Sequence, residues 1–517
     1  MLPSDATIVV DRLLTQAIRQ PLNIKTNIDL AEAALASGRE SHALPLLETA
    51  AVQHQTSASL WQWVGLLHRS IDQHEAAMVA FGRAASIAPN DPLIQHSLAR
   101  TTLESGLPAI SAFDVAVRLA PNNAAVLLGR AAALLAGGEA GLALNEIDAV
   151  LVKNPGWRAG HETAARLRWM SGQREMFLAS LDTALRKHPR DHVLWRIMLD
   201  LLMQAEQYEA VLETVSRACL EIGEQDFLFA QKAAANAELG QFEQADADYA
   251  RLNICDDDKS FIVRRMRHLL RTGRVCEAVQ YAESKIGGEA NNLIWPYLGT
   301  AWRLLKDSRW EWYEGDPALI REYDIGASLP SLDELAAVLR QLHKTVHQPL
   351  DQTIRGGTQT DGNLFLRLNA PIRALRATII DAVHDYLNQL GPIQTAHPTL
   401  SHQRIWPVRF AGAWSVRLMS SGFHVRHTHP SGWLSSVFYV TLPECVEHTD
   451  RQDGWLVLGS PPHELGTGLD PIRVIQPKIG RLVLFPSTMW HGTNPFMHGE
   501  RMTVAFDIAA PKTGHLI

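Results

Sequence analysis

The chain has 517 residues, and its 46% hydrophobic and 20% charged residues are typical of a folded globular protein. Asp and Glu (55) outnumber Lys and Arg (48), and the formal net charge of −7 argues against a nucleic-acid partner, which favours a basic surface. A chain of this length is expected to contain about three domains.

Roughly the first 300 residues are rich in Ala and Leu and predict one helix after another with a regular period. The period is marked by prolines spaced 32, 34 and 34 residues apart, at Pro89, Pro121, Pro155 and Pro189. Eight positions before each proline lies a bulky apolar residue: Phe81, Phe113, Ile147 and Leu181. Five positions before each lies a smaller one: Ala84, Ala116, Val150 and Ala184.

A second feature also recurs, a turn glycine followed five residues later by alanine. The pairs are Gly38 and Ala43, Gly138 and Ala143, Gly240 and Ala245, and Gly273 and Ala278. Glycine permits the turn between two helices, and the small alanine lets the second helix pack closely on the first. Gly172 is followed by Phe177 instead, which predicts one degenerate repeat. The pattern resembles the tetratricopeptide repeat, with about seven or eight copies between residues 30 and 305.

Such repeats stack into a superhelical solenoid with a concave groove. We therefore expect an all-α tetratricopeptide-repeat solenoid over residues 1–310. Two uses of it stay open. The groove can bind a protein or peptide, or the solenoid can serve as a rigid scaffold or as an arm that joins copies of the chain into a homo-oligomer.

Residues 311–400 are expected to cap the solenoid and to supply helices that support a following barrel. The aromatic run from Arg309 to Tyr313 predicts the cap. Ser331 and Glu334 form a capping box for a helix from Leu332 to Val346. A glycine-rich segment, 355–360, predicts a turn, and a second helix is expected from Pro371 to Leu390.

Residues 401–517 contain short β-rich runs separated by Gly, Pro and Asp, which predict an all-β sandwich or barrel. The runs are Trp414 to Met419, Ser435 to Thr441, Gly454 to Leu458, Arg473 to Gln476, Arg481 to Phe485 and Met502 to Ile508.

Three histidines in this part are candidate metal ligands and catalytic residues. His427 and His429 are two residues apart, so on a strand they point to the same face, as two ligands of one ion must. His491 follows a predicted core strand closely and can reach the interior of a barrel. Imidazole suits Fe, Zn, Cu and Ni. His424 is expected on the opposite face, in a structural or peripheral role.

Four polar residues are candidates for binding a cosubstrate. Arg501 and Thr503 share one face of the last predicted strand, where a guanidinium and a hydroxyl can together bind a carboxylate. Ser436 and Tyr439 lie on the strand 435–441 and can contact the same molecule or serve ordinary sheet packing.

In combination, these motifs resemble the iron(II)/2-oxoglutarate-dependent oxygenases that are fused to tetratricopeptide repeats in bacteria. The resemblance is carried by Trp414 to Leu418, His427 to Pro430, Gly432 to Ser436, Leu484 to Ser487, Trp490 to Gly492 and Arg501 to Asp507. It implies a double-stranded β-helix, related to jelly rolls and cupins, with flanking helices. It also implies Fe(II), O2 and 2-oxoglutarate, and oxidative decarboxylation of 2-oxoglutarate coupled to hydroxylation of a substrate.

One departure leaves the ligand set open, because the broad superfamily has an aspartate or glutamate where this chain has His429. The metal can be bound by all three histidines, by His427 and His491 with a carboxylate such as Asp450 or Asp453, or by these two histidines and water. The shared strand face favours the first set.

The leading hypothesis is an iron(II)- and 2-oxoglutarate-dependent dioxygenase in which Arg501 and Thr503 bind the distal carboxylate of 2-oxoglutarate. The alternatives are a three-histidine cupin-type oxygenase that does not use 2-oxoglutarate, and a catalytically inactive scaffold or sensor.

The compartment is expected to be the reducing cytoplasm. Cys219, Cys255, Cys276 and Cys445 are far apart and form no CxxC pair, which excludes a disulfide scaffold and a cysteine zinc site. The first residues lack the pattern of a signal peptide. No stretch reaches the roughly 18 uncharged apolar residues of a membrane span, so no membrane partner is expected.

Overall fold

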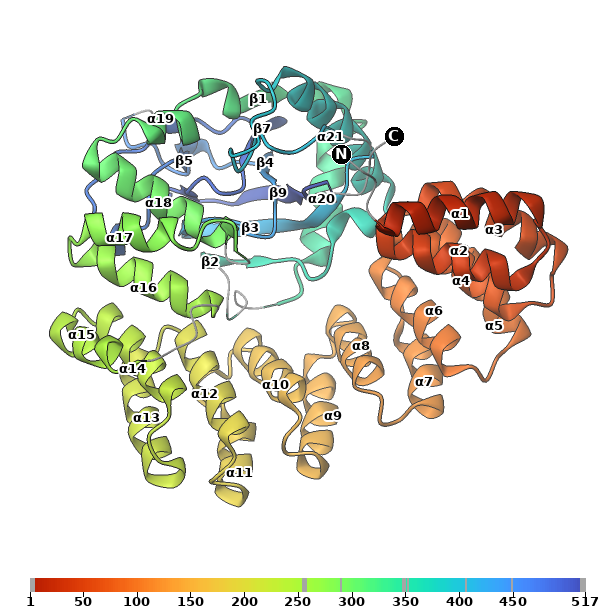
Figure 1. Ribbon diagram of the computed structural model, residues 1–517, viewed down its shortest axis with the longest axis horizontal. Coiled ribbons are helices and arrows are strands. Elements are labelled where there is room, and N and C mark those ends of the chain that lie inside the picture. Colours follow the sequence, from red (N-terminus) through yellow and green to blue (C-terminus); the bar gives the residue numbers. More distant parts are fainter. Residues whose placement is uncertain are drawn as a thin grey trace.

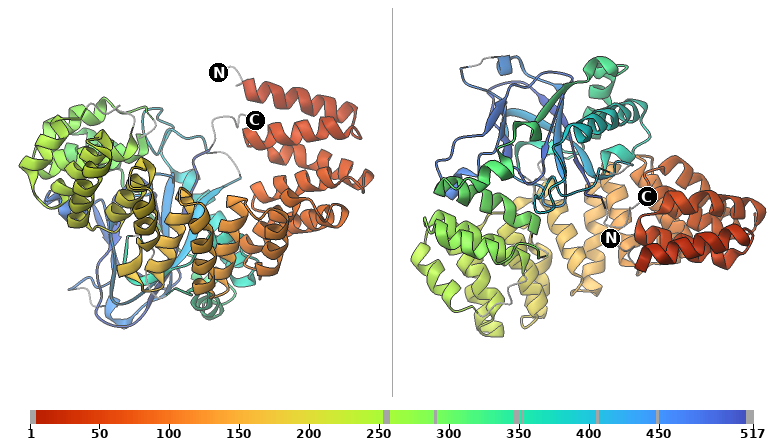
Figure 2. Two further views of the ribbon diagram at one scale, coloured as in Figure 1. Left: turned by 90° about the horizontal axis from the view of Figure 1, so that it is seen from below. Right: turned by 45° about the horizontal axis from the view of Figure 1, so that its top comes forward.

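The computed structural model describes residues 5–252, 258–288, 291–345, 350, 353–404, 407–447 and 450–511. Helices fill the N-terminal part and an antiparallel sheet fills the C-terminal part. The helices follow a curved path, and the sheet lies on the inner side of this curve, between its two ends (Figures 1 and 2). The predicted fold class, a helical-repeat solenoid followed by a curled antiparallel sheet of the jelly-roll type, is confirmed.

The solenoid consists of helix pairs, with α2 to α17 making eight consecutive pairs in the described residues. The helices are α1 (Asp5–Arg19), α2 (Ile24–Ser37), α3 (Glu40–Gln53), α4 (Ala58–Ser70), α5 (His74–Ile87), α6 (Pro92–Glu104), α7 (Ile110–Leu119), α8 (Ala124–Ala136), α9 (Ala140–Lys153), α10 (Arg158–Met170), α11 (Ala179–Lys187), α12 (His192–Gln204), α13 (Tyr208–Ile222), α14 (Asp226–Glu238), α15 (Phe242–Ala250), α16 (Lys259–Arg271), α17 (Val275–Glu283) and α18 (Asn291–Leu305).

The repeat signals in the sequence have direct physical causes. Gly38 ends α2 with a φ of 74°, the left-handed conformation that glycine adopts without strain. Gly65 of α4 lies against Phe81 of α5, and a Cβ at Gly65 would be 2.7 Å from the phenyl ring. In the degenerate repeat, α11 begins only at Ala179, and Phe177 packs edge-on against Trp169 with ring centroids 5.4 Å apart.

The predicted aromatic cap is α19 (Arg309–Glu314), which packs on α18. Tyr313 is buried and stacks on Trp295, with ring centroids 5.5 Å apart. The same hydrophobic cluster includes Leu465 and Trp490 of the C-terminal part. The cap therefore also joins the solenoid to the sheet.

The sheet has nine strands in the described residues, in the order β1-β7-β4-β9-β3-β8-β5-β6, with β2 paired to β3. The strands are β1 (Arg321–Asp324), β2 (Ile354–Gln359), β3 (Phe410–His427), β4 (Leu434–Thr441), β5 (Leu456–Leu458), β6 (Arg473–Ile475), β7 (Arg481–Pro486), β8 (His491–Thr493) and β9 (Arg501–Ile508). The long strand β3 pairs with β9 through its first half and with β8 near its end.

Two helices, α20 (Leu332–Leu342) and α21 (Ala370–Gln389), cover the outer face of the sheet. Leu434 and Phe438 of β4 pack against this layer, whereas Val437 and Tyr439 belong to a second cluster on the inner face. Because both faces of β4 are covered, the strand is apolar on both sides rather than alternating.

Two expectations for residues 311–400 need correction. The glycine-rich segment 355–360 is not a turn, because most of it forms β2, and a Cβ at Gly357 would lie 2.5 Å from the carbonyl oxygen of Arg417 on β3. The helix that begins at Leu332 ends at Leu342, and Val346 lies outside the described residues. Strands β1 and β2 precede residue 400 but belong to the same sheet as the later strands. The expected domain boundary at residue 400 therefore stays a prediction.

The sheet is attached to the solenoid by arginines that bind carboxylates near the turns inside the helix pairs. Arg409 donates to Glu40 at 2.8 Å and to the carbonyl oxygen of Ser70 at 2.8 Å. Arg355 contacts Glu206 at 2.8 Å. Further ion pairs join Arg376 to Asp72 and Arg373 to Glu75.

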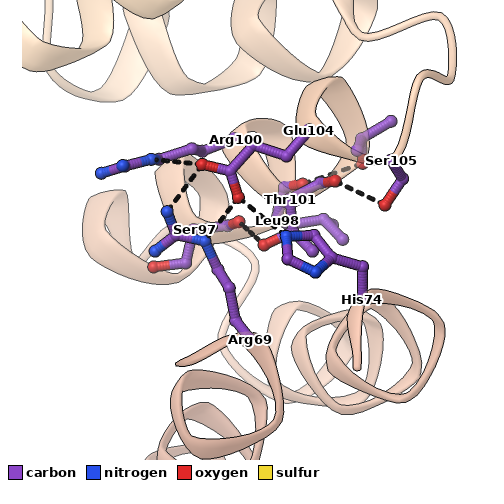
Figure 3. Close-up of polar contacts among 9 residues, drawn as sticks. Arg69, His74, Ser97, Leu98, Arg100, Thr101, Glu104 and Ser105 are labelled. Carbon is purple, nitrogen blue, oxygen red and sulfur yellow. Dashed lines mark hydrogen bonds and ion pairs between the residues drawn. The ribbon is translucent and has the colours of Figure 1, made fainter. Parts of the chain in front are cut away.

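Inside the solenoid, Glu104 joins three helices (Figure 3). Arg69 of α4 binds its carboxylate with Nε and Nη2, each at 2.7 Å, and Arg100 of α6 adds a bond of 2.9 Å. His74 Nε2 of α5 lies 3.1 Å away. Burial opposes the charged carboxylate, but these hydrogen bonds hold the pKa of Glu104 well below its usual range.

No helix in the described parts of the chain is long and apolar enough to cross a bilayer. Cys219, Cys276 and Cys445 are free thiols, and Cys255 lies outside the described residues.

Candidate metal centre

The three candidate histidines meet on the inner side of the curled sheet. His427 ends β3 and is the register partner of His491, which begins β8. His429 lies in the turn after β3, where its N–H donates to the carbonyl oxygen of Ser487 at 2.9 Å. The three ring centroids are 4.2 to 4.9 Å apart, and the candidate ligand atoms all lie within 4.8 Å of one another.

Each of the three imidazoles is oriented by a hydrogen bond at Nδ1. The acceptors are the carbonyl oxygens of Val425 for His427 (2.7 Å) and of Met489 for His491 (3.0 Å), and the carboxylate of Asp507 for His429 (2.7 and 2.8 Å). These oxygens can only accept, so Nδ1 carries the proton in each ring. A neutral imidazole then has its lone pair on Nε2, the arrangement typical of metal-binding histidines.

Burial favours the neutral form of two of these rings. Loss of solvent, and then the neighbouring histidines, lower the pKa of His427 and of His491 well below the usual value. Near neutral pH both rings are therefore uncharged, and a metal ion does not have to displace a proton from them.

Carboxylates take no direct part in this cluster within the described residues. Asp450 and Asp453, the acidic candidates, are not members of it, and Asp453 instead pairs with Arg451 at 3.0 Å. Asp507 contacts the cluster only through Nδ1 of His429. Of the three ligand sets that the sequence left open, the geometry favours the one made of three histidines.

Arg501 and Thr503 line the same cavity as the histidines, as their shared strand face predicts. Both are buried, with Arg501 only 1% exposed. The guanidinium donates from Nε to the carbonyl oxygen of Gly454 at 3.2 Å, while Nη2 has no hydrogen-bond partner among the described residues. Burial lowers the pKa of Arg501, and Tyr439 acts in the opposite direction. No carboxylate in the described residues forms an ion pair with it.

Tyr439 and Ser436 differ in their surroundings and in the hydrogen bonds that their hydroxyl groups make. Tyr439 is fully buried, its ring centre is 5.2 Å from the guanidinium carbon of Arg501, and burial raises its pKa to about 12. Ser436 borders the cavity, but its hydroxyl donates to the carbonyl oxygen of Phe506 (2.9 Å) and accepts from the N–H of Phe506 (3.0 Å). The hydroxyl of Ser436 thus serves the sheet, the second role that the sequence left open.

The strand face expected for His424 is wrong, while its expected structural or peripheral role stays a prediction. The register shifts between His424 and His427, where three steps along β3 correspond to two along β8. This β-bulge turns His424 toward the cavity, where its ring stacks on His427 with centroids 5.7 Å apart. Strict alternation of faces, on which the expectation relied, does not hold across a bulge.

Asp507 was not among the residues predicted for the site. It orients His429 and accepts a hydrogen bond of 2.6 Å from Ser435. A signal was available, because Asp507 lies on the same strand face as Arg501 and Thr503. Its contact with His429 depends on how β9 lies beside the turn after β3, which the sequence alone does not give.

Residues 412–507 match a family model described as "Putative 2OG-Fe(II) oxygenase". The match covers less than half of the chain and confirms the resemblance for this part. The comparison with curated proteins gives no match.

Solved structures similar to the N-terminal part are tetratricopeptide-repeat proteins. One is YrrB, described as a TPR protein with an unusual peptide-binding site, at 21% identity over 35% of this chain and 94% of that chain, with a TM-score of 0.29. A second is a protein from Parabacteroides merdae, at 16% identity over 44% and 91%, with a TM-score of 0.29. A third is a thermophilic TPR protein from Thermus thermophilus, at 20% identity over 33% and 94%, with a TM-score of 0.25. Because these scores are low, the repeat architecture rests on the helix pairs themselves.

Proposed function

We propose that the protein is an iron(II)- and 2-oxoglutarate-dependent dioxygenase that hydroxylates a substrate. One observation carries the proposal: a cavity of the curled sheet holds three histidines, each oriented by a hydrogen bond at Nδ1, together with Arg501, which lacks a carboxylate partner in the described residues. The match of residues 412–507 to the oxygenase family model supports the same activity.

In this proposal His427, His429 and His491 hold Fe(II) through Nε2. Bound iron, O2 and 2-oxoglutarate supply the chemistry, in which 2-oxoglutarate and O2 are converted to succinate and CO2 while a substrate C–H bond becomes C–OH. Three neutral histidines leave the iron with one negative charge fewer than two histidines and a carboxylate would. Asp507 offsets part of this difference, because its charge acts on the iron through the ring of His429.

Arg501 and Thr503 bind the distal carboxylate of 2-oxoglutarate. A guanidinium buried without an anion is costly, and a carboxylate that accepts two parallel N–H bonds removes that cost. Thr503 is 2% exposed and can donate its hydroxyl to the same carboxylate. Tyr439 packs on the guanidinium and helps to hold its plane.

The test is release of succinate from 2-oxoglutarate by the full chain, with and without Fe(II). Even without its substrate, we expect slow succinate release that depends on iron and falls to background in His491→Ala. Iron-dependent succinate at the same rate in His491→Ala would assign the activity to contaminating metal or protein.

A three-histidine oxygenase that does not use 2-oxoglutarate is the second candidate, and the absence of a carboxylate from the described histidine cluster favours it. Such an enzyme would keep the three histidines but have no need of Arg501. Iron-dependent O2 uptake without 2-oxoglutarate would support it, whereas neither O2 uptake nor succinate release would point to an inactive scaffold or metal sensor.

We propose in addition that the solenoid recruits an acidic segment of a protein or peptide, as partner or substrate. In Figure 1, α8, α10 and α12 lie nearer the sheet than α9, α11 and α13. A hydrogen-bond chain crosses this inner layer of helices. Arg158 lies 3.3 Å from Asp200, Gln231 donates to Asp200 at 2.8 Å, and Arg264 donates to Gln231 at 2.7 Å.

Two arginines in this layer have no carboxylate ion-pair partner among the described residues. Arg264 donates only to Gln231, and Arg196 is exposed above the ring of Phe227, 4.5 Å from its centre. A labelled peptide of alternating Glu and Asp should bind the parent with strong salt dependence. It should bind more weakly to Arg196→Glu but not to Arg186→Glu, which changes an arginine of α11 in the outer layer. Equal binding to both variants would refute the assignment.

The cytoplasm remains our proposal for the compartment, and the three free thiols are compatible with it.

A further inference from the structure

The last helix of the solenoid, α18, contacts both segments that carry candidate metal ligands outside β3. It is buried along most of its length, with α16 and α17 on one side and the sheet on the other. One segment is the turn that contains His429. The other is the segment that leads through Trp490 into the short strand β8, which begins at His491.

The first contact lies at the start of α18. Asn292 Nδ2 donates to the carbonyl oxygen of Pro430 at 3.0 Å. His429, the preceding residue, belongs to no strand, and its position depends on a few hydrogen bonds such as the one from its N–H to Ser487. The bond from Asn292 therefore helps to fix where the imidazole of His429 lies.

The second contact is made by Trp490, the residue before His491. Its indole Nε1 lies 3.1 Å from both the carbonyl oxygen of Pro296 and the hydroxyl of Thr300. The Thr300 hydroxyl donates to the Pro296 carbonyl at 2.8 Å, so its lone pairs are free to accept from the indole. The Trp490 ring also meets Tyr297 edge-on, with centroids 5.2 Å apart.

A third contact reaches Gly459, just after β5, the strand that pairs with β8, and Asp470 before β6. Arg303 of α18 donates to the carbonyl oxygens of Gly459 and of Asp470. The N–H of Gly459 in turn donates to the carbonyl oxygen of Trp490 at 2.7 Å. The indole of Trp490 therefore bonds directly to α18, and the backbone of Trp490 is linked to α18 through Gly459 and Arg303.

We infer that α18 positions the metal centre, with Trp490, Thr300 and Asn292 as positioning residues that set the spacing between His429 and His491. The inference rests on the proposed function, because it takes the three histidines as the ligands of one metal ion. His427 needs no such support, since it is part of the long strand β3. Residues that orient metal ligands commonly change metal affinity by about 10–100-fold when they are replaced.

The experiment compares two tryptophan variants of the full chain. Trp490→Phe removes the indole N–H at the junction. Trp195→Phe is the matched control, because Trp195 is equally buried in the solenoid and also donates to a proline carbonyl oxygen, that of Pro189, at 2.7 Å. Anaerobic Fe(II) affinity is measured by competition with a chelator. The ligand-field spectrum of bound Co(II) reports the geometry of the ligands.

We expect Trp490→Phe to bind Fe(II) about tenfold more weakly than the parent and to shift the Co(II) spectrum, while Trp195→Phe matches the parent in both. Should Trp490→Phe fold poorly, the Fe(II) affinities of Thr300→Val and Thr300→Ser provide the test. Only serine keeps the hydroxyl, so the affinity should fall in Thr300→Val and not in Thr300→Ser. Parent-like affinity in Trp490→Phe, or equal loss in both tryptophan variants, would overturn the inference alone. A parent that binds no Fe(II) would overturn the proposed function, and the inference with it.

Discussion

Two clusters of this molecule use the same kinds of side chain and differ in how their charges are balanced. In the solenoid, the carboxylate of Glu104 accepts from Arg69, Arg100 and His74 (Figure 3). In the sheet, three histidines and Arg501 share a cavity, and within the described residues only Asp507 brings a carboxylate to them, at Nδ1 of His429.

The difference separates a structural cluster from a candidate functional one. The charged groups of the Glu104 cluster find partners within the chain, although Nδ1 of His74 has none among the described residues. The sheet cluster leaves Nη2 of Arg501 without a partner in the described residues, at a cost to stability that burial makes larger. We take the combination of an unpaired guanidinium with three converging histidines, rather than the residue types alone, as the sign of a site that is completed from outside the chain.

The largest expected effect is loss of iron from a histidine variant. His427→Ala or His491→Ala each removes one of three ligands, so stoichiometric Fe(II) should be lost from the full chain after anaerobic loading and desalting. His74→Ala is the counterpart in the solenoid. It should lower the free energy of unfolding by about 1–3 kcal/mol, typical of a lost buried hydrogen bond, and retain one iron per chain. Full iron in either ligand variant would contradict the assignment.

The next effect compares Arg501 with Arg69, which binds the carboxylate of Glu104 with two parallel bonds. Arg501→Lys keeps the charge but loses the planar fork, so 2-oxoglutarate should bind about tenfold or more weakly, since a charge-assisted hydrogen bond contributes about 1.5–3 kcal/mol. Iron affinity should stay nearly unchanged. Arg69→Lys removes the two parallel bonds to Glu104 and should lower the free energy of unfolding without changing 2-oxoglutarate binding. Calorimetry that finds parent-like 2-oxoglutarate binding in Arg501→Lys would remove the main support for this cosubstrate.

A smaller effect is expected from carboxylates that contact histidines. Asp507→Asn keeps the size of the side chain but removes the charge that acts on His429, so Fe(II) affinity should fall about tenfold. Glu48→Gln is the control, because Glu48 contacts Nε2 of His68 in the solenoid at 2.9 Å. Chelator competition should give the parent affinity for that variant. Loss of Fe(II) affinity in both variants, or in neither, would contradict a specific role of Asp507 at the metal centre.

The last expected effect bears on stability and not on ligand binding, and it is a difference in pH dependence between Glu314, which is buried, and Glu104, which is partly buried. Burial, opposed by Arg303 and Tyr313, raises the pKa of Glu314 to about 8 from its ordinary 4.5, so between these values the folded state holds more protons than the unfolded state. Stability due to Glu314 is therefore lost as pH rises from about 4.5 to 8, by up to about 1.4 kcal/mol per pH unit.

Glu104 acts in the opposite sense, because its pKa is lowered and its contribution is lost as pH falls below about 4.5. Urea unfolding at pH 5.5, 6.5 and 7.5 should show that Glu314→Gln flattens the decline with rising pH, while Glu104→Gln does not. Parallel pH profiles for the parent and Glu314→Gln would show that burial of Glu314 has no such effect.

The sequence predicts best where a structural requirement repeats or alternates. Turn glycines and closing prolines each recur in several repeats, so the solenoid can be predicted from positions such as Gly38 and Pro89. The meeting of His427 and His429 is predicted from a shared strand face, whereas in the structure β3 ends at His427 and His429 lies in the turn that follows.

Features that depend on the arrangement of distant segments could not be predicted in this way. Strands β1 and β8 are too short to show a period of two. The bulge that turns His424 toward the cavity arises from its pairing with β8, and Asp507 reaches His429 only because β9 lies beside β3. The contact of Trp490 with α18 joins residues 190 or more positions apart.

The most direct test of the central claim is anaerobic calorimetric titration of 2-oxoglutarate into the full chain, with and without bound Fe(II). If the three histidines and Arg501 form one site, the iron-loaded protein should bind one 2-oxoglutarate per chain, and the metal-free protein should bind it far more weakly. No saturable binding to the iron-loaded protein, or equal binding without iron, would contradict the account.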